Sequence, residues 1–273
     1  MKKLPTLKYV NHLGEIIDFN TKNYFTNSYI MRDYVWNYDS DFYKIKNFNT
    51  VGVGSKTLSV SVYASSQNEA FELFNFLFEV FEKDVLAQIP GKFYIGDYYF
   101  AGYVISSSKK EFLSSQNLLS LDLTVISDTN TWVREVTYSF SKNQLISGHG
   151  YVYKYPYRYS SGALKMLFNE ALTNSDFKLI IYGSTSNPEL YIGGHRYLVD
   201  VPIESKEYLE INSREKTLEL IQSDGTRTSA LKFRNRDSYI FQKIPTGTVS
   251  ISLNNDFGFD LTIYDERSEP LWI

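Results

Sequence analysis

The stretch of sequence that decides the fold runs from Asn68 to Ser106 and reads NEAFELFNFLFEVFEKDVLAQIPGKFYIGDYYFAGYVIS. Its first half, Asn68–Ala87, repeats apolar residues with the period of an α-helix. Ser66 and Glu69 have the spacing of a capping box at its start, and a Pro-Gly pair ends it. Strand-type residues then follow on both sides of a Gly-Asp turn. The stretch predicts one long helix that leads directly into a β-hairpin.

The predicted helix is more apolar than a single contact face requires. Its polar residues occupy one narrow sector of the helical wheel, so that apolar residues cover roughly 220°, whereas a helix on one sheet needs about 100°. The excess apolar surface packs either against a second layer of the same domain or against a neighbouring subunit. The candidate subunit contacts are Phe71, Phe74, Leu77, Phe78 and Phe81.

The rest of the chain reads mostly as short strands. Residues 56–64, KTLSVSVYA, alternate apolar and polar side chains as a half-buried strand does, and similar segments recur on both sides of the polar region 128–150. We therefore expect two domains, 1–136 and 137–273. A second, shorter helix is predicted over 162–172. The predicted fold class is mainly β, with strands and turns spaced as in a sandwich or barrel.

Composition argues against several classes of function. The chain has 273 residues and a net charge of −3, so it lacks the basic balance of a protein that coats nucleic acid. It has no cysteine, and His12, His149 and His195 lie far apart, so we expect no metal and no cofactor. No phosphate-binding loop or nucleophile pattern is present, and no pair of carboxylates stands out. We expect a protein that is not an enzyme, made in the cytoplasm and without a membrane segment.

Aromatic residues make up 16% of the chain, with 23 Tyr and 19 Phe, and they are densest in YVYKYPYRY, residues 151–159. Tyrosine takes every odd position there, so an extended strand would place five tyrosines on one face. That face packs on its own domain, contacts another protein, or stacks on sugars. The residues concerned are Tyr151, Tyr153, Tyr155, Tyr157 and Tyr159.

The chain ends on an apolar group that directly follows a charged cluster. We expect Pro270 to turn the chain out of a last strand, so that Leu271, Trp272 and Ile273 dock in a pocket. Charge-assisted hydrogen bonds from the cluster would orient this return, and the sequence leaves open which domain or subunit forms the pocket. The residues of the cluster are Glu266, Arg267 and Glu269.

Several segments, taken in order, resemble the distal tail protein (Dit) family of long-tailed, non-contractile phages and prophages of Gram-positive bacteria. The resemblance covers nearly the whole chain and includes the helix, the Pro-Gly pair and the hairpin after it. It is strongest in IYG…NP and in ERSEPLW. The other segments are YVNHLGEIIDFN (9–20), RDYVWNYDSDFYKIKNF (32–48), YPYRY (155–159), SDFKLIIYGSTSNPELYIGGHRY (175–197) and FQKIPTGTVSIS (241–252).

The resemblance implies an N-terminal ring-forming domain, a β-sandwich or split barrel with one long helix and a hairpin. It implies a C-terminal galectin-like jelly-roll β-sandwich without an inserted carbohydrate-binding module. Six copies would form a ring hub in the virion tail tip, with a central channel for DNA in transit. The implied partners are the tail tube protein, the tail-associated tip protein (Tal), and receptor-binding and tape measure proteins. Glu266, Arg267, Glu269, Pro270, Leu271 and Trp272 would be a structural family signature.

Two other functions remain open at this point. The second half could be a carbohydrate-binding β-sandwich module that contributes to attachment at the host surface, with the tyrosine face of residues 151–159 as its platform. An enzyme that cleaves glycans or peptidoglycan is the third reading, and it needs a carboxylate pair that the sequence does not single out. Binding of glycans by the second half, or turnover of cell-wall material, would distinguish these functions from a structural hub.

Overall fold

A computed structural model describes residues 6–26, 30–49, 53–113, 117–142, 165–253 and 257–272. The described chain is mainly β, with one α-helix besides two short 3-10 helices, as the sequence predicts. It divides into two compact units, Met1–Arg134 with Arg267–Ile273, and Glu135–Glu266. The tail from Arg267 therefore groups with the first unit, although the sequence division places it in the second.

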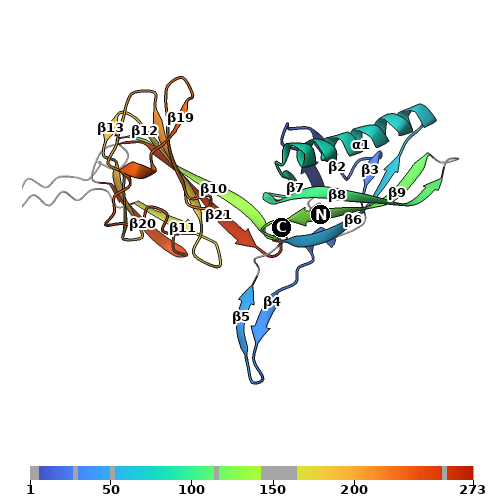
Figure 1. Cartoon of the computed structure of the whole chain (residues 1–273), viewed down its shortest axis with the longest axis horizontal. Coiled ribbons are helices and arrows are strands. Elements are labelled where there is room, and N and C mark those ends of the chain that lie inside the picture. Colours follow the sequence, from blue (N-terminus) through green and yellow to red (C-terminus); the bar gives the residue numbers. More distant parts are fainter. Residues whose placement is uncertain are drawn as a thin grey trace, which may run out of the picture. The chain divides into compact units, whose positions relative to one another are not determined.

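Two runs of antiparallel strands, joined by the long strand β8, build the first unit (Figure 1). Its part up to Gly102 pairs with β7, and its part from Tyr103 pairs with β9, so one strand belongs to both runs. The orders are β10-β8-β7-β1-β2 and β8-β9-β6-β3. The strands are β1 (Leu7–Val10), β2 (Ile16–Asp18), β3 (Tyr24–Phe25), β6 (Gly54–Tyr63), β7 (Gly91–Ile95), β8 (Tyr98–Leu113), β9 (Leu118–Ser127) and β10 (Trp132–Phe140).

The helix α1 (Gln67–Ala87) covers this unit's core, and its ends follow the sequence signals. The Ser66 hydroxyl accepts a hydrogen bond from the Glu69 amide at 3.3 Å, as expected for a capping box. The Glu69 carboxylate returns to the amide of Ser65, one residue earlier than the motif requires, at 2.7 Å. Gln88 ends the helix in the left-handed conformation, with φ of 55°, before the expected Pro-Gly pair. The hairpin of β7 and β8 then turns at the expected Gly-Asp, since Ile95 pairs with Tyr98.

The second unit has two main antiparallel sheets whose buried side chains form one core. The orders are β19-β18-β17-β12-β21-β10 and β11-β20-β14-β15, and β13 pairs with β16 in a small ribbon. These two layers fit a β-sandwich, and the galectin-like topology stays a prediction. The strands are β11 (Lys165–Asn169), β12 (Phe177–Tyr182), β13 (Thr185–Ser186), β14 (Glu189–Ile192), β15 (His195–Leu198), β16 (Pro202–Ile203), β17 (Tyr208–Asn212), β18 (Thr217–Ile221), β19 (Arg227–Ser229), β20 (Gly247–Leu253) and β21 (Phe259–Arg267).

One local prediction is wrong. The shorter helix expected over 162–172 is strand β11 in its described part, where Lys165–Asn169 pairs in register with β20. Alternate residues of this strand face the core, and Leu167 is buried while Met166 and Phe168 are exposed. Pairing with a distant strand therefore overrides the helix-forming residue types of this segment.

Candidate assembly surfaces

The described residues hold no group of three or more His, Asp or Glu side chains that could bind a metal ion. His12 contacts the buried Asp84 carboxylate through Nδ1, and His195 Nε2 lies 2.9 Å from the carbonyl oxygen of Tyr239. His149 lies outside the described residues. No helix in the described part of the chain is long and apolar enough to cross a membrane. The two described histidines thus serve internal contacts of their own units.

The chain's end is held by four residues that we call the C-terminal clamp: Arg32, Glu269, Pro270 and Trp272. Arg32 is only 4% exposed and donates a hydrogen bond to the Pro270 carbonyl at 2.8 Å. Its guanidinium carbon lies 3.9 Å from the centre of the Trp272 ring, a cation–π geometry. Glu269 Oε1 lies 3.6 Å from Arg32 and accepts a hydrogen bond from Trp272 Nε1 at 2.7 Å. The clamp belongs wholly to the first unit.

Buried polar groups fix the backbone that carries Arg32. Residues Ile30–Arg32 form the short helix η1, and the Met31 carbonyl accepts hydrogen bonds from Lys56 at 3.1 Å and from Trp132 Nε1 at 3.2 Å. Lys56 also donates to the Asp33 carbonyl. Burial lowers the pKa of Lys56, while the charges of Asp33 and Glu269 act in the opposite direction. Sequence reasoning missed these residues because no local pattern links them to a tail more than 200 positions away.

Within the single chain, the residues of the expected apolar anchor are largely uncovered. Leu271 and Trp272 are 41% and 59% exposed, so no pocket encloses them, and Ile273 lies outside the described residues. Polar contacts hold the tail, and Glu269 orients Trp272 as the charged cluster suggested. Glu266 instead pairs with Arg214 at 3.2 Å inside the second unit, and Arg267 is half-buried. The described part of this chain supplies no pocket for the terminal residues, so docking of Leu271 and Trp272 in a pocket of a neighbouring subunit stays a prediction.

The helix α1 divides the predicted interface residues between core and surface. Leu77 and Phe81 are buried in the first unit's core, and Phe74 and Phe78 pack against it while half-buried. Phe71 is 51% exposed, and the apolar Leu86, outside the predicted set, is also exposed. Part of the wide apolar arc of α1 is thus buried against the sheets of its own unit. This narrows the proposed subunit contact to the outward side chains of the helix.

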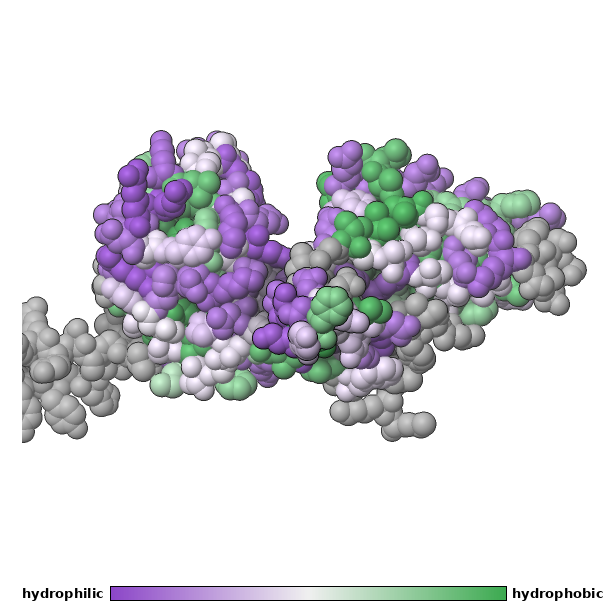
Figure 2. All heavy atoms as spheres, turned by 60° about the horizontal axis from the view of Figure 1, so that its bottom comes forward, coloured by the Kyte–Doolittle hydropathy of each residue, from purple (hydrophilic) through white to green (hydrophobic). Residues whose placement is uncertain are grey.

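A second exposed apolar surface lies on the hairpin of β4 (Asn37–Ser40) and β5 (Ile45–Asn49), which pair with each other. Figure 2 turns the lower end of Figure 1, where this hairpin lies, toward the viewer. A two-stranded hairpin is marginally stable alone, and contiguous exposed apolar groups mark interaction sites. Sequence reasoning used this segment only for the family resemblance. The exposed apolar residues of the hairpin are Tyr38, Phe42, Tyr43, Ile45 and Phe48, and Tyr34, Val35 and Trp36 directly precede it.

The predicted tyrosine face of residues 151–159 lies outside the described residues. Whether it packs on its own unit, contacts a partner or binds sugar therefore stays a prediction. The exposed apolar residues that the structure does describe lie on α1, on the β4–β5 hairpin and at the C-terminal tail, all in the first unit, and at scattered positions elsewhere. The first unit thus carries the strongest candidates for contact with other proteins.

No family model matches the chain, and no curated protein matches it. Several solved structures do match the chain. The SPP1 Dit protein, described as a paradigm of the hub adsorption apparatus in phages that infect Gram-positive bacteria, has a TM-score of 0.62 at 9% identity. The match covers 97% of this chain and 100% of that one. Chains of the phage P2 baseplate in its activated conformation, with calcium and with strontium, each have a TM-score of 0.61 at 12% identity. They cover 98% of this chain and 100% of the other. The chain therefore has the fold of a Dit-like phage tail hub protein, as the sequence resemblance predicted.

Proposed function

We propose that this protein is a structural hub of a phage tail tip, in which six copies form a ring around a channel for DNA. One observation carries the proposal: the fold matches that of the SPP1 Dit hub over 97% of this chain and over all of that chain. A match across both whole chains, rather than one shared module, supports the same kind of role. Fold alone does not imply function, so the surfaces of the chain have to supply the rest.

Those surfaces support assembly rather than catalysis. The first unit exposes aromatic and aliphatic side chains on α1, on the β4–β5 hairpin and at the tail. Interfaces between subunits are rich in such side chains, and a ring needs two different contact surfaces on each copy. The helix is proposed as one of these surfaces and the hairpin as the other. The acidic balance of the chain, at −3, suits a channel through which DNA passes without sticking.

The proposed partners follow from the hub role. The ring would join the tail tube protein to the tail-associated tip protein, with receptor-binding and tape measure proteins as further contacts. The protein would then be located in the virion tail tip after its synthesis in the cytoplasm of the bacterial host. In this proposal the chain has a structural role and needs no catalytic residue or cofactor.

Light scattering on a size-exclusion column, with negative-stain images of the main peak, tests the proposal. We expect a six-subunit species with an open centre, formed by the protein alone or after addition of its tip protein. The images separate a closed ring from a linear aggregate of similar mass. A monomer at every concentration, with and without the tip protein, would refute the ring.

A further inference from the structure

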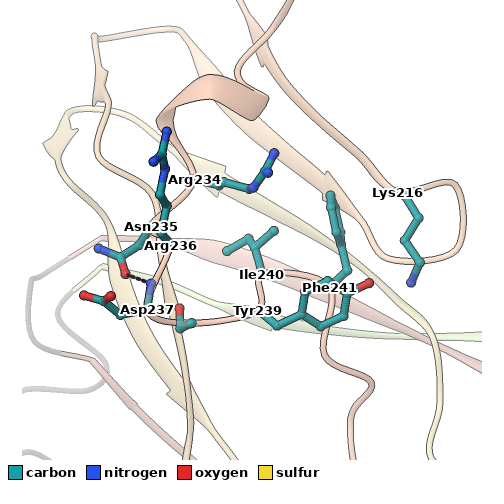
Figure 3. Close-up of a pocket in the computed structure, with 9 residues that line it drawn as sticks. Lys216, Arg234, Asn235, Arg236, Asp237, Tyr239, Ile240 and Phe241 are labelled. Carbon is teal, nitrogen blue, oxygen red and sulfur yellow. Dashed lines mark hydrogen bonds between the residues drawn. The ribbon is translucent and has the colours of Figure 1, made fainter.

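The second unit contains a cavity of about 540 Å³, within the usual range for small-molecule sites (Figure 3). All but one of its lining residues belong to the continuous segment 234–241, and Lys216 enters from the turn between β17 and β18. We call this cavity the basic pocket. The basic pocket lies in the second unit, whereas the surfaces proposed for ring contacts lie in the first unit.

Positive charge dominates the lining of the basic pocket. Lys216, Arg234 and Arg236 contribute cations and Asp237 contributes the one carboxylate among its nine lining residues, although the whole chain is acidic. Arg234 and Arg236 are exposed, so their guanidinium groups are open to a ligand from solvent. Guanidinium groups bind phosphate and carboxylate with two parallel hydrogen bonds. The pocket thus has the chemistry to bind an anion.

An aromatic platform lies beside these cations. The Tyr239 ring is 55% exposed and packs edge-on against the nearly buried Phe241, with ring centres 6.0 Å apart. The Lys216 ammonium lies 5.8 Å from the Tyr239 ring centre and 5.6 Å from that of Phe241. The Tyr239 carbonyl is also held by His195 at 2.9 Å. The exposed Tyr239 ring therefore packs against Phe241, and its backbone is held by His195.

Polar groups of the same segment complete the lining. The Ser238 hydroxyl oxygen is buried and has no hydrogen-bond partner in the described structure. Buried polar atoms without a partner are rare in folded proteins and call for a missing partner. Asn235 is held by the amide of Asp237, which donates to its side-chain oxygen at 2.9 Å (Figure 3). Because the Ser238 oxygen is enclosed by the protein, the polar side chains of this segment that a ligand can reach are the exposed Arg234, Arg236 and Asp237 and the half-buried Asn235.

We propose that the basic pocket binds an anionic sugar, a pyranose that carries a phosphate or carboxylate group. The arginines and Lys216 bind the anionic group, and the Tyr239 face stacks on the sugar ring. The cations and the exposed aromatic ring of the lining then both have a partner on one ligand. An acidic peptide such as oligo-glutamate would use the cations but leaves the exposed Tyr239 ring without a specific role. This binding needs only the second unit and holds whether or not six copies form a ring.

Calorimetric titration of the full chain tests the proposal with four small probes and one peptide. The probes are N-acetylglucosamine 6-phosphate, glucuronic acid, neutral N-acetylglucosamine and inorganic phosphate, and the peptide is an oligo-glutamate. We expect one of the two anionic sugars to bind at least about tenfold more tightly than both the neutral sugar and inorganic phosphate. Which anionic sugar binds distinguishes a phosphate-bearing ligand from a carboxylate-bearing one.

Two variants locate the binding site. Arg236→Glu should weaken anionic-sugar binding about tenfold or more, because it replaces a cation of the pocket with a carboxylate. Tyr239→Ala should reduce the affinity for the anionic sugar to that for inorganic phosphate, because it removes the stacking face. Lys206→Glu is the matched control, since it makes the same charge change at an exposed residue of the second unit outside the pocket lining. Circular dichroism verifies that all three variants fold.

Four results would overturn the proposal. They are no binding of either anionic sugar, equal binding of inorganic phosphate, tighter binding of the oligo-glutamate, and an equal loss of affinity in Lys206→Glu. The third result would assign the pocket to an acidic peptide instead. None of these results bears on ring formation, which is measured separately by light scattering.

Discussion

At the scale of single residues, the first unit depends on one buried carboxylate. Asp84 on α1 is fully buried, accepts hydrogen bonds from the Tyr9 hydroxyl and from the His12 amide at 2.9 Å, and contacts His12 Nδ1. Burial, followed by the hydrogen bond to Asp84, raises the pKa of Tyr9 far above its ordinary range. Gly91 leaves room for this pair, because an added Cβ would lie 2.1 Å from the Tyr9 hydroxyl oxygen.

Tyr9→Phe should therefore destabilise the first unit by about 1–3 kcal/mol, since it leaves the buried Asp84 side chain without one of its hydrogen-bond donors. All three tryptophans lie in the first unit, so urea unfolding followed by tryptophan fluorescence reports on that unit. Tyr63→Phe, at an exposed tyrosine of the same unit, should leave the midpoint unchanged. Equal midpoints for Tyr9→Phe and the unaltered protein would show that the Asp84 network contributes no net stability.

A carboxylate of the second unit makes stability depend on pH. Asp176 pairs with Lys243 at 2.8 Å and accepts from the Ser213 hydroxyl at 2.8 Å. Burial tends to raise the pKa of Asp176, but Lys243 and Ser213 outweigh it and lower the pKa below its usual 3.8. A lowered pKa stabilises the folded state above the unfolded value, and this contribution is lost as the pH falls through the folded value.

Asp176→Asn should therefore lower stability by about 1 kcal/mol at pH 7, and the difference should shrink below about pH 3.8 as the unaltered carboxyl takes up a proton. Thermal unfolding followed by circular dichroism at pH 7, 5 and 3 measures this. Asp200→Asn is the control, because Asp200 is an exposed carboxylate of the same unit. A difference between Asp176→Asn and the unaltered protein that stays constant across this range would contradict the assignment.

At the scale of elements, the helix α1 has one set of apolar residues packed in the core and another exposed and available for assembly. Its inward residues Leu77 and Phe81 are fixed by the core, whereas Phe71 and Leu86 point outward. Replacing Phe71 and Leu86 together with Glu should abolish the proposed ring and leave the secondary structure intact, because it puts charges into an apolar contact without disturbing the core. Light scattering reports the oligomeric state, and circular dichroism reports folding.

Asn75→Glu on the same helix is the control for this pair. Asn75 is exposed and polar, so an added charge there should leave assembly as it is. If the Phe71 and Leu86 variant still forms six-subunit rings, the helix is no subunit contact and the β4–β5 hairpin becomes the main candidate.

The elements also show what could be predicted from the sequence and why. The helix and the β7–β8 hairpin were predicted well because their signals are local: a capping residue, a period and a turn. The strand β11 was missed because its helix-type residues are overridden by pairing with β20, about 80 residues further along the chain. The clamp was missed for the same reason, since Arg32 reaches the tail across 238 positions. Helix caps, hydrophobic periods and turns can be predicted from a single sequence, whereas the pairing of residues far apart in the chain cannot.

At the scale of the whole molecule, the second unit is an insertion in the first. The chain leaves the first unit after Arg134 and rejoins it at Arg267, so the tail completes a unit that begins near the N-terminus. The C-terminal clamp supplies non-covalent contacts that hold the returning tail, and within it the Trp272 ring stays largely exposed. The tail therefore matters for the first unit's stability through Arg32 rather than through burial of Trp272.

This gives a graded prediction for two clamp residues. Arg32→Met should destabilise the first unit by about 1–3 kcal/mol, because the buried Pro270 carbonyl loses its donor and Glu269 loses its ion-pair partner. Trp272→Ala should cost less than about 1 kcal/mol, since it removes a half-exposed cation–π contact. Tryptophan fluorescence during urea unfolding compares them, with Arg227→Met in an exposed ion pair of the second unit as a control that should not change the signal.

In the double variant the two effects should not add, because Trp272 acts through Arg32. Equal effects of the two single changes would mean that the tail is held by the tryptophan, as a buried anchor would be.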